Sequence, residues 1–351
     1  MSSEGKESVL FFLLSGEHPT LPHAELKAVL EAFGVRYEVI GELAQLSRLK
    51  CEPGRSAELI YRTAFTKACC LELAVSRAEE EEILSAASDV PFWEFVRPGQ
   101  SFRIRVRRVR GASPDISVMD LEAKLGSVVF KAVRDLKVDL VRPDVEFLGV
   151  LTEGMFFLGL KLSEVVRPGF TDRRPSKRPF FHPTAMMPKL ARCMVNLARS
   201  RPGELVLDPF CGTGSILIEA GLLGCRILGS DINAKMAFGC LLNLRFFGLE
   251  PEGVLTADAL RPPFTRADRV VTDPPYGRSS STAGLEVREI YEGLLALLPE
   301  LVEEGKMACI AAPSQLGMAD MASEAGLELV EAHYYFVHSG LTRELAVLQV
   351  P

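Results

Sequence analysis

The sequence predicts an α/β carboxyl-terminal domain, with a mostly parallel sheet and a final antiparallel hairpin, preceded by an α+β amino-terminal region. Three observations predict this. From residue 204 onward, short apolar strands alternate with helices, which is the rhythm of a parallel sheet. Before residue 165, strands and helices mix without that rhythm. Between them, residues 165–182 are rich in Pro, Arg and Lys and predict an extended basic linker.

Length and composition agree with two folded domains. The 351 residues exceed the size of one typical domain of roughly 150 residues. Hydrophobic residues make up 48% and charged residues 25% of the chain, which excludes disordered, collagen-like and coiled-coil proteins. No apolar run reaches the length of a membrane span, and the start MSSEGKES lacks the pattern of a secretion signal. We therefore expect a cytoplasmic protein with no membrane partner.

The eight cysteines include no CxxC pair and no recognisable disulfide framework. We interpret them as buried thiols and expect no metal site.

Charge is distributed unevenly along the chain. The net charge of −6 would argue against a nucleic-acid partner. Residues 101–200, however, carry 19 Lys and Arg against 10 Asp and Glu, whereas the rest of the chain carries 21 against 36. The basic charge is concentrated in the middle third.

The amino-terminal region predicts an α+β order of elements. SFRIRVRRVRG (101–111) alternates Phe102, Ile104 and Val106 with arginines, which is typical of a half-buried strand with a basic outer face. The other expected elements are a buried strand at 8–16, a helix at 23–34, strand-like segments at 35–50, a helical and then strand-like segment at 58–76, a helix at 79–88, a helix at 120–137 and a hairpin at 145–162 around Glu153 and Gly154.

The carboxyl-terminal domain predicts a parallel sheet followed by an antiparallel hairpin at its edge. Ligands of such sheets lie beyond the carboxyl ends of the strands, so the functional residues should follow the strands directly. The expected strands are 204–208, 226–231, 253–258, 269–273 and 306–313 with helices at 214–224, at 233–248 and from about Leu285, and the hairpin strands are 327–340 and 344–350, joined at Gly340.

The first motif, DPFCGTGSILIEA, starts at Asp208, where a strand ends and a helix follows. Gly212 and Gly214 permit a positive φ and let a ligand approach the backbone, and the helix start offers free N–H groups. A glycine turn after a strand is common, so this motif alone leaves a structural turn open. Its spacing differs from GxGxxG, and no Walker lysine follows, which disfavours nicotinamide and ATP.

Two acidic residues end the next two strands. Asp231, in GSDIN, can accept hydrogen bonds from both hydroxyls of a ribose; alternatively, Asp231 or Asn233 caps the following helix. Asp258, in TADAL, stands where it can meet an adenine amino group. Together with the first motif, these residues predict a nucleoside-containing ligand.

TDPPYG, from Thr272 to Gly277, is the most specific motif. Two consecutive prolines cannot donate to the sheet, so the chain leaves the sheet here. Asp273 and the carbonyl of Pro274 can then accept both hydrogens of one amino group, and Tyr276 offers a ring on which a base can stack. A tight turn without a ligand is the alternative.

These motifs resemble those of class I S-adenosylmethionine-dependent methyltransferases that act on exocyclic amines, whose catalytic turn reads [DNS]PP[YFW]. The resemblance implies a Rossmann-like domain with a seven-stranded, mostly parallel sheet, S-adenosyl-L-methionine as the cofactor and no metal. It implies catalytic roles for Asp273, Pro274, Pro275 and Tyr276. The cofactor-binding residues that it implies are Thr184, Asp208, Pro209, Phe210, Gly212, Thr213, Gly214, Asp231, Ile232, Asp258 and Ala259.

The combination is more similar still to the archaeal tRNA guanine-10 N2-methyltransferases, strongly over residues 180–351 and weakly before 165. This resemblance implies a ferredoxin-like subdomain at about 1–55, a THUMP-like domain at about 56–164, a basic linker at 165–182 and a methyltransferase domain at 183–351. It implies methylation of guanine N2 in tRNA to the N2-methyl and, where the pocket has room, the N2,N2-dimethyl form. We expect a monomer and allow for a small activating protein partner.

Three alternatives remain open. A sister group that methylates guanine 6 of tRNA has an Asn in place of Asp273. A second alternative is methylation of adenine N6 or cytosine N4 in RNA or DNA, which are exocyclic amines of the same kind. The third alternative is a non-enzymatic RNA-binding protein with a vestigial cofactor fold. The intact motifs disfavour it.

The tRNA backbone should meet the basic residues of the middle third. For the five arginines from Arg103 to Arg110, the alternative is a strand face that is exposed to solvent and binds no RNA. The expected phosphate contacts are Arg103, Arg105, Arg107, Arg108, Arg110, Arg173, Arg174, Lys177 and Arg178.

Overall fold

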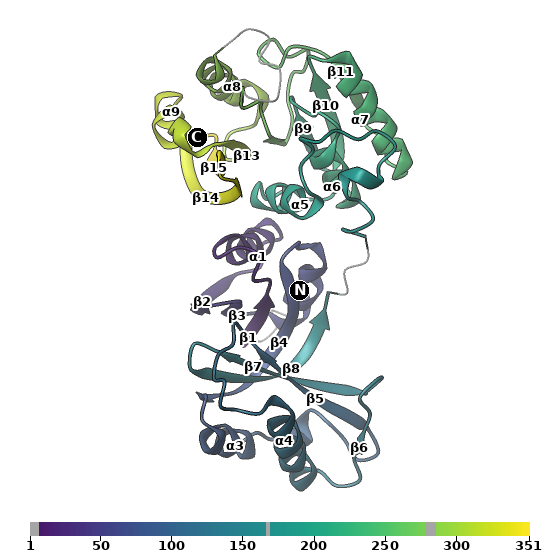
Figure 1. The fold of residues 1–351 in the computed structure, drawn as a ribbon, viewed down its shortest axis with the longest axis vertical. Coiled ribbons are helices and arrows are strands. Elements are labelled where there is room, and N and C mark those ends of the chain that lie inside the picture. The colour runs from purple at the N-terminus through teal and green to yellow at the C-terminus, as the bar shows by residue number, and fades with distance from the viewer. Residues whose placement is uncertain (1–6, 166–168, 278–285) are drawn as a thin grey trace, which may run out of the picture. The chain divides into compact units, whose positions relative to one another are not determined.

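The computed structural model describes residues 7–165, 169–277 and 286–351 (Figure 1). The chain forms two compact units. Unit 1 comprises Met1–Leu26, Gly34–Tyr61 and Phe65–Val166, and unit 2 comprises Lys27–Phe33, Arg62–Ala64 and Arg167–Pro351. No described helix is long and apolar enough to cross a membrane.

Unit 1 is built around one sheet of eight strands in the order β2-β3-β1-β4-β8-β7-β5-β6. The strands are β1 (Ser8–Leu14), β2 (Tyr37–Leu43), β3 (Leu46–Cys51), β4 (Thr66–Arg77), β5 (Ser101–Arg108), β6 (Lys137–Val138), β7 (Val145–Thr152) and β8 (Met155–Glu164). The helices are α1 (Leu21–Ala32), whose end belongs to unit 2, α2 (Pro53–Leu59), α3 (Glu80–Ser88) and α4 (Val118–Ala132), with 3₁₀ turns at Ile60–Arg62 and Phe92–Glu94.

The long strand β4 joins the two expected amino-terminal subdomains into one sheet, because it pairs with β1 on one side and with β8 on the other. The predicted hairpin is confirmed: β7 and β8 are antiparallel, and Glu153 and Gly154 both have positive φ in the tight turn between them. Apolar side chains of α3 and α4 pack on the sheet in one buried core that includes Ile83, Leu125 and Phe147. Along β5, the arginines of the outer face alternate with the buried residues Phe102, Ile104 and Val106, as the sequence pattern predicts.

Unit 2 has a seven-stranded sheet in the order β11-β10-β9-β12-β13-β15-β14. Its strands are β9 (Leu205–Asp208), β10 (Arg226–Asp231), β11 (Gly253–Thr256), β12 (Arg269–Thr272), β13 (Met307–Pro313), β14 (Glu328–His338) and β15 (Leu341–Gln349). Its helices are α5 (Pro188–Leu197), α6 (Ser215–Leu222), α7 (Ala234–Phe246), α8 (Val287–Leu301) and α9 (Met318–Glu324), with 3₁₀ turns at Pro175–Lys177 and Ser314–Leu316.

The predicted fold class is confirmed. The strands from β11 to β13 run parallel, and β15 is antiparallel to both β13 and β14. Helices α8 and α9 bury Tyr291, Leu294 and Met321 against the sheet, where Val270 and Ile310 complete the core. The helix expected from about Leu285 is α8, which starts at Val287; Leu285 itself lies outside the described residues.

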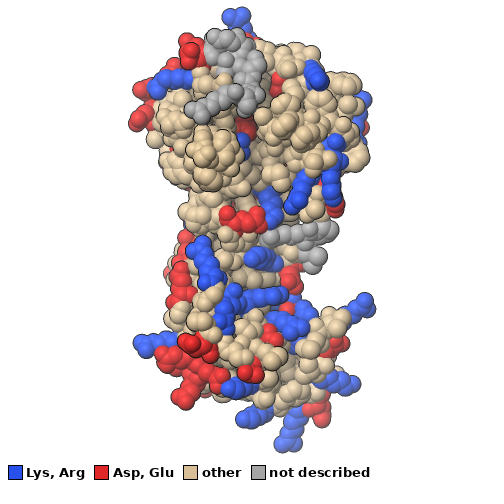
Figure 2. Space-filling view, in the orientation of Figure 1, with Lys and Arg blue, Asp and Glu red and all other residues tan. Residues whose placement is uncertain are grey.

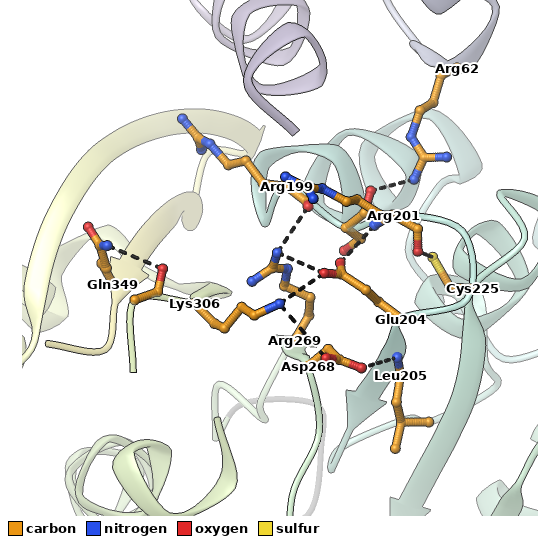
Figure 3. Close-up of polar contacts among 12 residues, drawn as sticks. Arg62, Arg199, Arg201, Glu204, Leu205, Cys225, Asp268, Arg269, Lys306 and Gln349 are labelled. Atoms are coloured by element: carbon orange, nitrogen blue, oxygen red, sulfur yellow. Dashed lines mark hydrogen bonds and ion pairs between the residues drawn. The ribbon is translucent and has the colours of Figure 1, made fainter. Parts of the chain in front are cut away.

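A cluster of ion pairs braces the amino-terminal ends of the parallel strands (Figure 3). Glu204 precedes β9 and contacts Arg269 at 3.2 Å and Lys306 at 3.1 Å, while Asp268 accepts a hydrogen bond from the backbone N–H of Leu205 at 2.8 Å. These charges neutralise one another across three strands. The polar residues that follow the strands, at the opposite edge of the sheet, are therefore the candidates for function.

Candidate functional site at the carboxyl ends of the parallel strands

The loop between β9 and α6 is the first part of the site. Gly212 and Gly214 both have positive φ, 52° and 84°, as the motif predicts. A Cβ atom on Gly214 would lie 2.7 Å from Sγ of Cys240, so only glycine fits where the loop meets α7. A Cβ atom on Gly212 would meet the Met236 side chain and the Phe210 carbonyl at 3.9 Å, which is ordinary van der Waals contact, so the positive φ rather than crowding favours glycine there.

Thr213, between these glycines, has a buried hydroxyl that lacks a hydrogen-bond partner within the described part of the chain. A buried hydroxyl without a partner costs free energy. A ligand with a polar group seated on this loop would remove that cost. The loop therefore fits a cofactor that approaches the backbone closely.

Asp231, at the end of β10, braces this loop. One carboxylate oxygen accepts the N–H of Gly212 at 3.0 Å, and the other accepts the N–H of Asn233 at 2.8 Å. The helix cap is Asn233, whose side chain accepts the N–H of Lys235 at 3.0 Å, so the cap alternative for Asp231 is excluded. Burial raises the pKa of Asp231, and the two backbone hydrogen bonds oppose that rise. Each oxygen keeps a second lone pair, with which it can accept a ligand hydroxyl.

Asp208, at the end of β9, points into the protein. It is 2% exposed and accepts hydrogen bonds from the Thr272 hydroxyl at 2.6 Å and from the N–H of Phe210 at 3.2 Å. Burial raises its pKa to about 7, opposed by these two hydrogen bonds and reinforced by the nearby charge of Asp273. Asp208 thus ties the cofactor loop to the strand that carries the catalytic turn.

The remaining expected cofactor residues lie in different environments. Asp258 is exposed and accepts the N–H of Leu260 at 3.0 Å. Thr184 is exposed and lies 2.7 Å from the His182 ring; it does not cap α5, whose N-cap is Met187. Of the other three residues, Pro209 and Ala259 are buried, and Ile232 is 48% exposed.

The turn from Asp273 to Tyr276 follows β12, the strand that pairs with β9. The Tyr276 hydroxyl donates a short hydrogen bond to Oδ1 of Asp273. The Tyr291 hydroxyl of α8 lies 3.0 Å from the carbonyl of Ala311 and 3.5 Å from that of Pro274. The Pro274 carbonyl thus keeps acceptor capacity for a ligand.

Sequence reasoning missed Arg343, which β15 places on this turn. Its Nη2 atom lies 3.2 Å from Oδ2 of Asp273, and its Nε atom donates to the Tyr276 hydroxyl at 2.7 Å. Its guanidinium carbon lies 5.4 Å from the centre of the Tyr276 ring. The only signal in the sequence is a charged pair, Arg343 and Glu344, at the start of an otherwise apolar strand.

The arginine counteracts the effect of burial on Asp273. Burial raises the pKa of this carboxyl group, and the Arg343 charge, followed by the Tyr276 hydrogen bond, opposes the rise. Burial also raises the pKa of Tyr276 well above its ordinary value, so this phenol is a hydrogen-bond donor at neutral pH.

The expected phosphate-binding arginines of β5 and of the residues just after it divide into two groups. Arg103 pairs with Glu146 at 2.6 Å, Arg105 lies 3.4 Å from Glu122, and Arg108 donates to a backbone carbonyl. Figure 2 shows acidic and basic side chains interspersed on the face of unit 1 that it draws. The other group, Arg107 and Arg110, is exposed.

Residues 169–182, which we expected as part of an extended linker, pack on unit 2. Arg173 donates to both carboxylate oxygens of Glu219 in α6, at 2.7 and 3.2 Å. Arg178 is 5% exposed and donates to the Ser215 hydroxyl at 2.7 Å, and burial lowers its pKa to about 10. Both arginines bind within the protein, whereas Arg174 and Lys177 are exposed. The sequence could not show this, because the partner carboxylate belongs to a helix of the next domain.

This packing predicts a large effect on stability. Glu219 is fully buried between Arg173 and Arg192, so Glu219→Gln leaves two arginines without their counter-charge. We expect the free energy of unfolding to fall by about 3–5 kcal/mol, measured by urea denaturation. The control is Glu252→Gln, which removes the exposed pair with Arg226 and should change stability little. Equal effects of the two variants would contradict the structural role of Glu219.

Comparisons with known proteins now bear on this site. A tRNA (guanine(10)-N2)-dimethyltransferase of Methanothermobacter thermautotrophicus is 37% identical over 97% of this chain and 99% of its own length. The enzyme of the same name from Methanocaldococcus jannaschii is 32% identical over 96% and 98%. This chain belongs to the tRNA (guanine(10)-N2)-dimethyltransferase family. The family that the motifs predicted is confirmed, and its methyl donor is S-adenosylmethionine.

Two family models match different parts of this dimethyltransferase-family chain. A THUMP domain matches residues 77–161, and an RMKL-like methyltransferase domain matches residues 175–344. A crystal structure of TrmN from Thermus thermophilus is 25% identical, with a TM-score of 0.53, and covers 98% of this chain and 100% of that one.

Proposed function

We propose that this protein transfers methyl groups from S-adenosylmethionine to the exocyclic N2 amine of guanine 10 in tRNA. The observation that carries the proposal is the pair of acceptors on the catalytic turn, the Asp273 carboxylate and the Pro274 carbonyl. They follow β12, directly beside the strand that bears the glycine loop. Relatives of this name match the chain almost end to end.

In this mechanism the chain orients a weak nucleophile. The lone pair of guanine N2 is delocalised into the ring, so alignment with the methyl group supplies much of the catalysis. The Asp273 carboxylate and the Pro274 carbonyl accept the two N–H bonds of the amine and stabilise its developing positive charge. Pro275 fixes the turn, and the Tyr276 ring stacks on the base, which is flipped out of the RNA.

When bound, S-adenosylmethionine would supply an electrophilic methyl group to the guanine nitrogen, and its positively charged sulfur would keep the electrons of the broken sulfur–carbon bond. The amine then loses one proton, which goes to the Asp273 carboxylate or to water. A second round on the same nitrogen gives the dimethyl form.

The residues around the glycine loop would hold the cofactor. We assign the ribose hydroxyls to Asp231, which retains acceptor capacity on both oxygens. The buried hydroxyl of Thr213, which has no partner within the described part of the chain, fits a polar group of a ligand seated on this loop. Further proposed contacts are Thr184, Asp208, Pro209, Phe210, Gly214, Ile232, Asp258 and Ala259.

The test uses labelled S-adenosylmethionine, the full-length protein and unmodified tRNA, followed by nuclease digestion and identification of the labelled nucleoside. We expect N2-methylguanosine and N2,N2-dimethylguanosine, and no label when guanine 10 of the tRNA is replaced by adenine. A matched tRNA with guanine 6 replaced is the control and should accept label normally. Label that survives the guanine 10 replacement would overturn the assignment of the nucleotide.

One observation favours a second candidate, guanine 6. A tRNA (guanine(6)-N2)-methyltransferase of Thermus thermophilus is 33% identical over 65% of this chain and 68% of its own length. The two replaced tRNAs give opposite results for the two positions. A labelled methyladenosine or methylcytosine would instead indicate another amine, and a chain that binds no cofactor would indicate a vestigial fold.

For tRNA binding we propose contacts from the exposed cations Arg107, Arg110, Arg174 and Lys177. Changing all four to Glu should weaken binding of every tRNA alike and flatten its dependence on salt. Each lost phosphate contact should lower the slope of log K against log salt by about 0.7–0.9. Filter binding at several salt concentrations measures this. An unaltered affinity and slope would show that tRNA binds elsewhere.

We further propose a cytoplasmic monomer that works with a small activating protein partner. Phe238, Leu242 and Phe246 recur every four residues along α7 and are 60%, 36% and 59% exposed. The adjacent strand β11 is an edge of the sheet, with Leu255 40% exposed. An apolar stripe beside an open strand edge is a surface that such a partner would cover.

A further inference from the structure

We propose that Arg343 is a positioning residue of methyl transfer, which holds the Asp273 carboxylate and the Tyr276 hydroxyl in place and supplies the counter-charge of the catalytic turn. The inference rests on the proposed role of Asp273 in binding the amine. It adds a residue from outside every sequence motif to the site.

The geometry of the contacts carries this inference. The two donors of the guanidinium go to two members of the same four-residue turn, Oδ2 of Asp273 at 3.2 Å and the Tyr276 hydroxyl at 2.7 Å. The Tyr276 hydroxyl in turn donates to Oδ1 of Asp273. The three side chains close a ring, and that ring fixes both oxygens of the carboxylate.

The place of the arginine in the sheet makes its charge costly unless it is paired. Arg343 is 9% exposed, and its neighbour across the sheet is Pro313 on β13. The side chains from Leu345 to Leu348 on the same strand are apolar and fully buried. A buried cation at the head of such a strand requires a partner that is also fixed. Asp273, in the turn after β12, is its ion-pair partner at 3.2 Å.

The charged and titratable groups that face Asp273 come from four elements. Tyr276 belongs to its own turn, Arg343 to β15, Tyr291 to α8 and Asp208 to β9. Among these described groups, Arg343 carries the positive charge. Burial raises the pKa of Asp273 and Arg343 opposes that rise, so removal of the arginine raises the pKa further. The carboxylate, which is the form that accepts the amine, then forms only at higher pH.

The experiment measures single-turnover methyl transfer to tRNA by full-length Arg343→Met and Arg343→Lys between about pH 5.5 and 9.5. For Arg343→Met we expect the acid limb to move to higher pH by about one unit or more, with the largest loss near pH 6.5 and partial recovery near pH 9. Arg343→Lys keeps the charge and should keep the acid limb near that of the wild type, with a lower plateau. The affinity for S-adenosylmethionine, measured by calorimetry, should stay within about twofold in both variants.

A merely structural role predicts a different result: an equal loss at every pH in both variants, with no rescue by lysine. That outcome overturns the proposal. If Arg343→Met does not fold, Arg343→Gln, which keeps hydrogen-bonding capacity without charge, carries the same expected shift. Failure of the proposed function is distinguishable, because it would appear as full activity of an Asp273→Ala variant, whereas failure of this inference leaves Asp273→Ala inactive.

Discussion

An Asp273→Ala variant should bind S-adenosylmethionine with nearly unchanged affinity and lose methyl transfer by about 10²–10³-fold. The reason is that we propose an amine contact for this carboxylate, which follows β12, and cofactor contacts for the loop after β9 and for Asp231. Removal of one preorganised group that stabilises charge in a transition state has effects of this size. Single-turnover kinetics with tRNA and calorimetry with the cofactor measure the two quantities separately.

The matched control is Asp273→Asn, which keeps one acceptor oxygen and the shape of the side chain but no charge. We expect an activity between those of the wild type and Asp273→Ala. Thermal unfolding of both variants checks for the loss of the ion pair with Arg343. If cofactor affinity fell in parallel with activity, Asp273 would belong to the cofactor site.

An Asp231→Ala variant should lose cofactor affinity by about tenfold to a hundredfold, the effect of removing a charged acceptor from bound hydroxyls. The loss has two parts, because Asp231 also holds the N–H of Gly212 at 3.0 Å and thereby the shape of the loop. Calorimetry gives the dissociation constant. Activity at saturating cofactor should recover, because the amine is held elsewhere.

Asn233→Ala provides the control for this variant. Asn233 lies two residues further along and caps α7 through the N–H of Lys235. Its removal should lower the melting temperature and leave cofactor affinity unchanged. Wild-type affinity in Asp231→Ala would show that neither this carboxylate nor its hydrogen bond to Gly212 contributes to cofactor binding.

The residues that could be predicted from the sequence are those whose role depends on local geometry. The positive φ of Gly212 and Gly214 follows from a turn directly after a strand, and consecutive prolines after β12 force the chain out of the sheet. The parallel pairing of the first five strands of unit 2 is expected from the alternation of strands and helices along the chain, and this pairing is confirmed. These features involve neighbours a few residues apart.

The residues that could not be predicted owe their role to distant partners. Arg343 meets Asp273 only because β15 enters the sheet beside β13. The first residues of β15 thereby lie at the carboxyl ends of the parallel strands. Arg173 and Arg178 look like exposed cations in a Pro-rich segment, yet α6 offers them a buried carboxylate and a hydroxyl. The sequence shows that these residues are charged, but it does not show which distant side chains neutralise their charges.

The chain order of the sheet also sets when this site is completed during protein synthesis. Among the described strands β15 comes last in the chain, and it inserts between β13 and β14, both of which are made before it. The same insertion delivers Arg343 to the catalytic turn. Closure of the sheet and completion of the catalytic turn are therefore one folding event. A chain in which β15 has not yet been made holds the glycine loop and the turn from Asp273 to Tyr276 without this arginine, so the turn gains its counter-charge only when β15 pairs with β13.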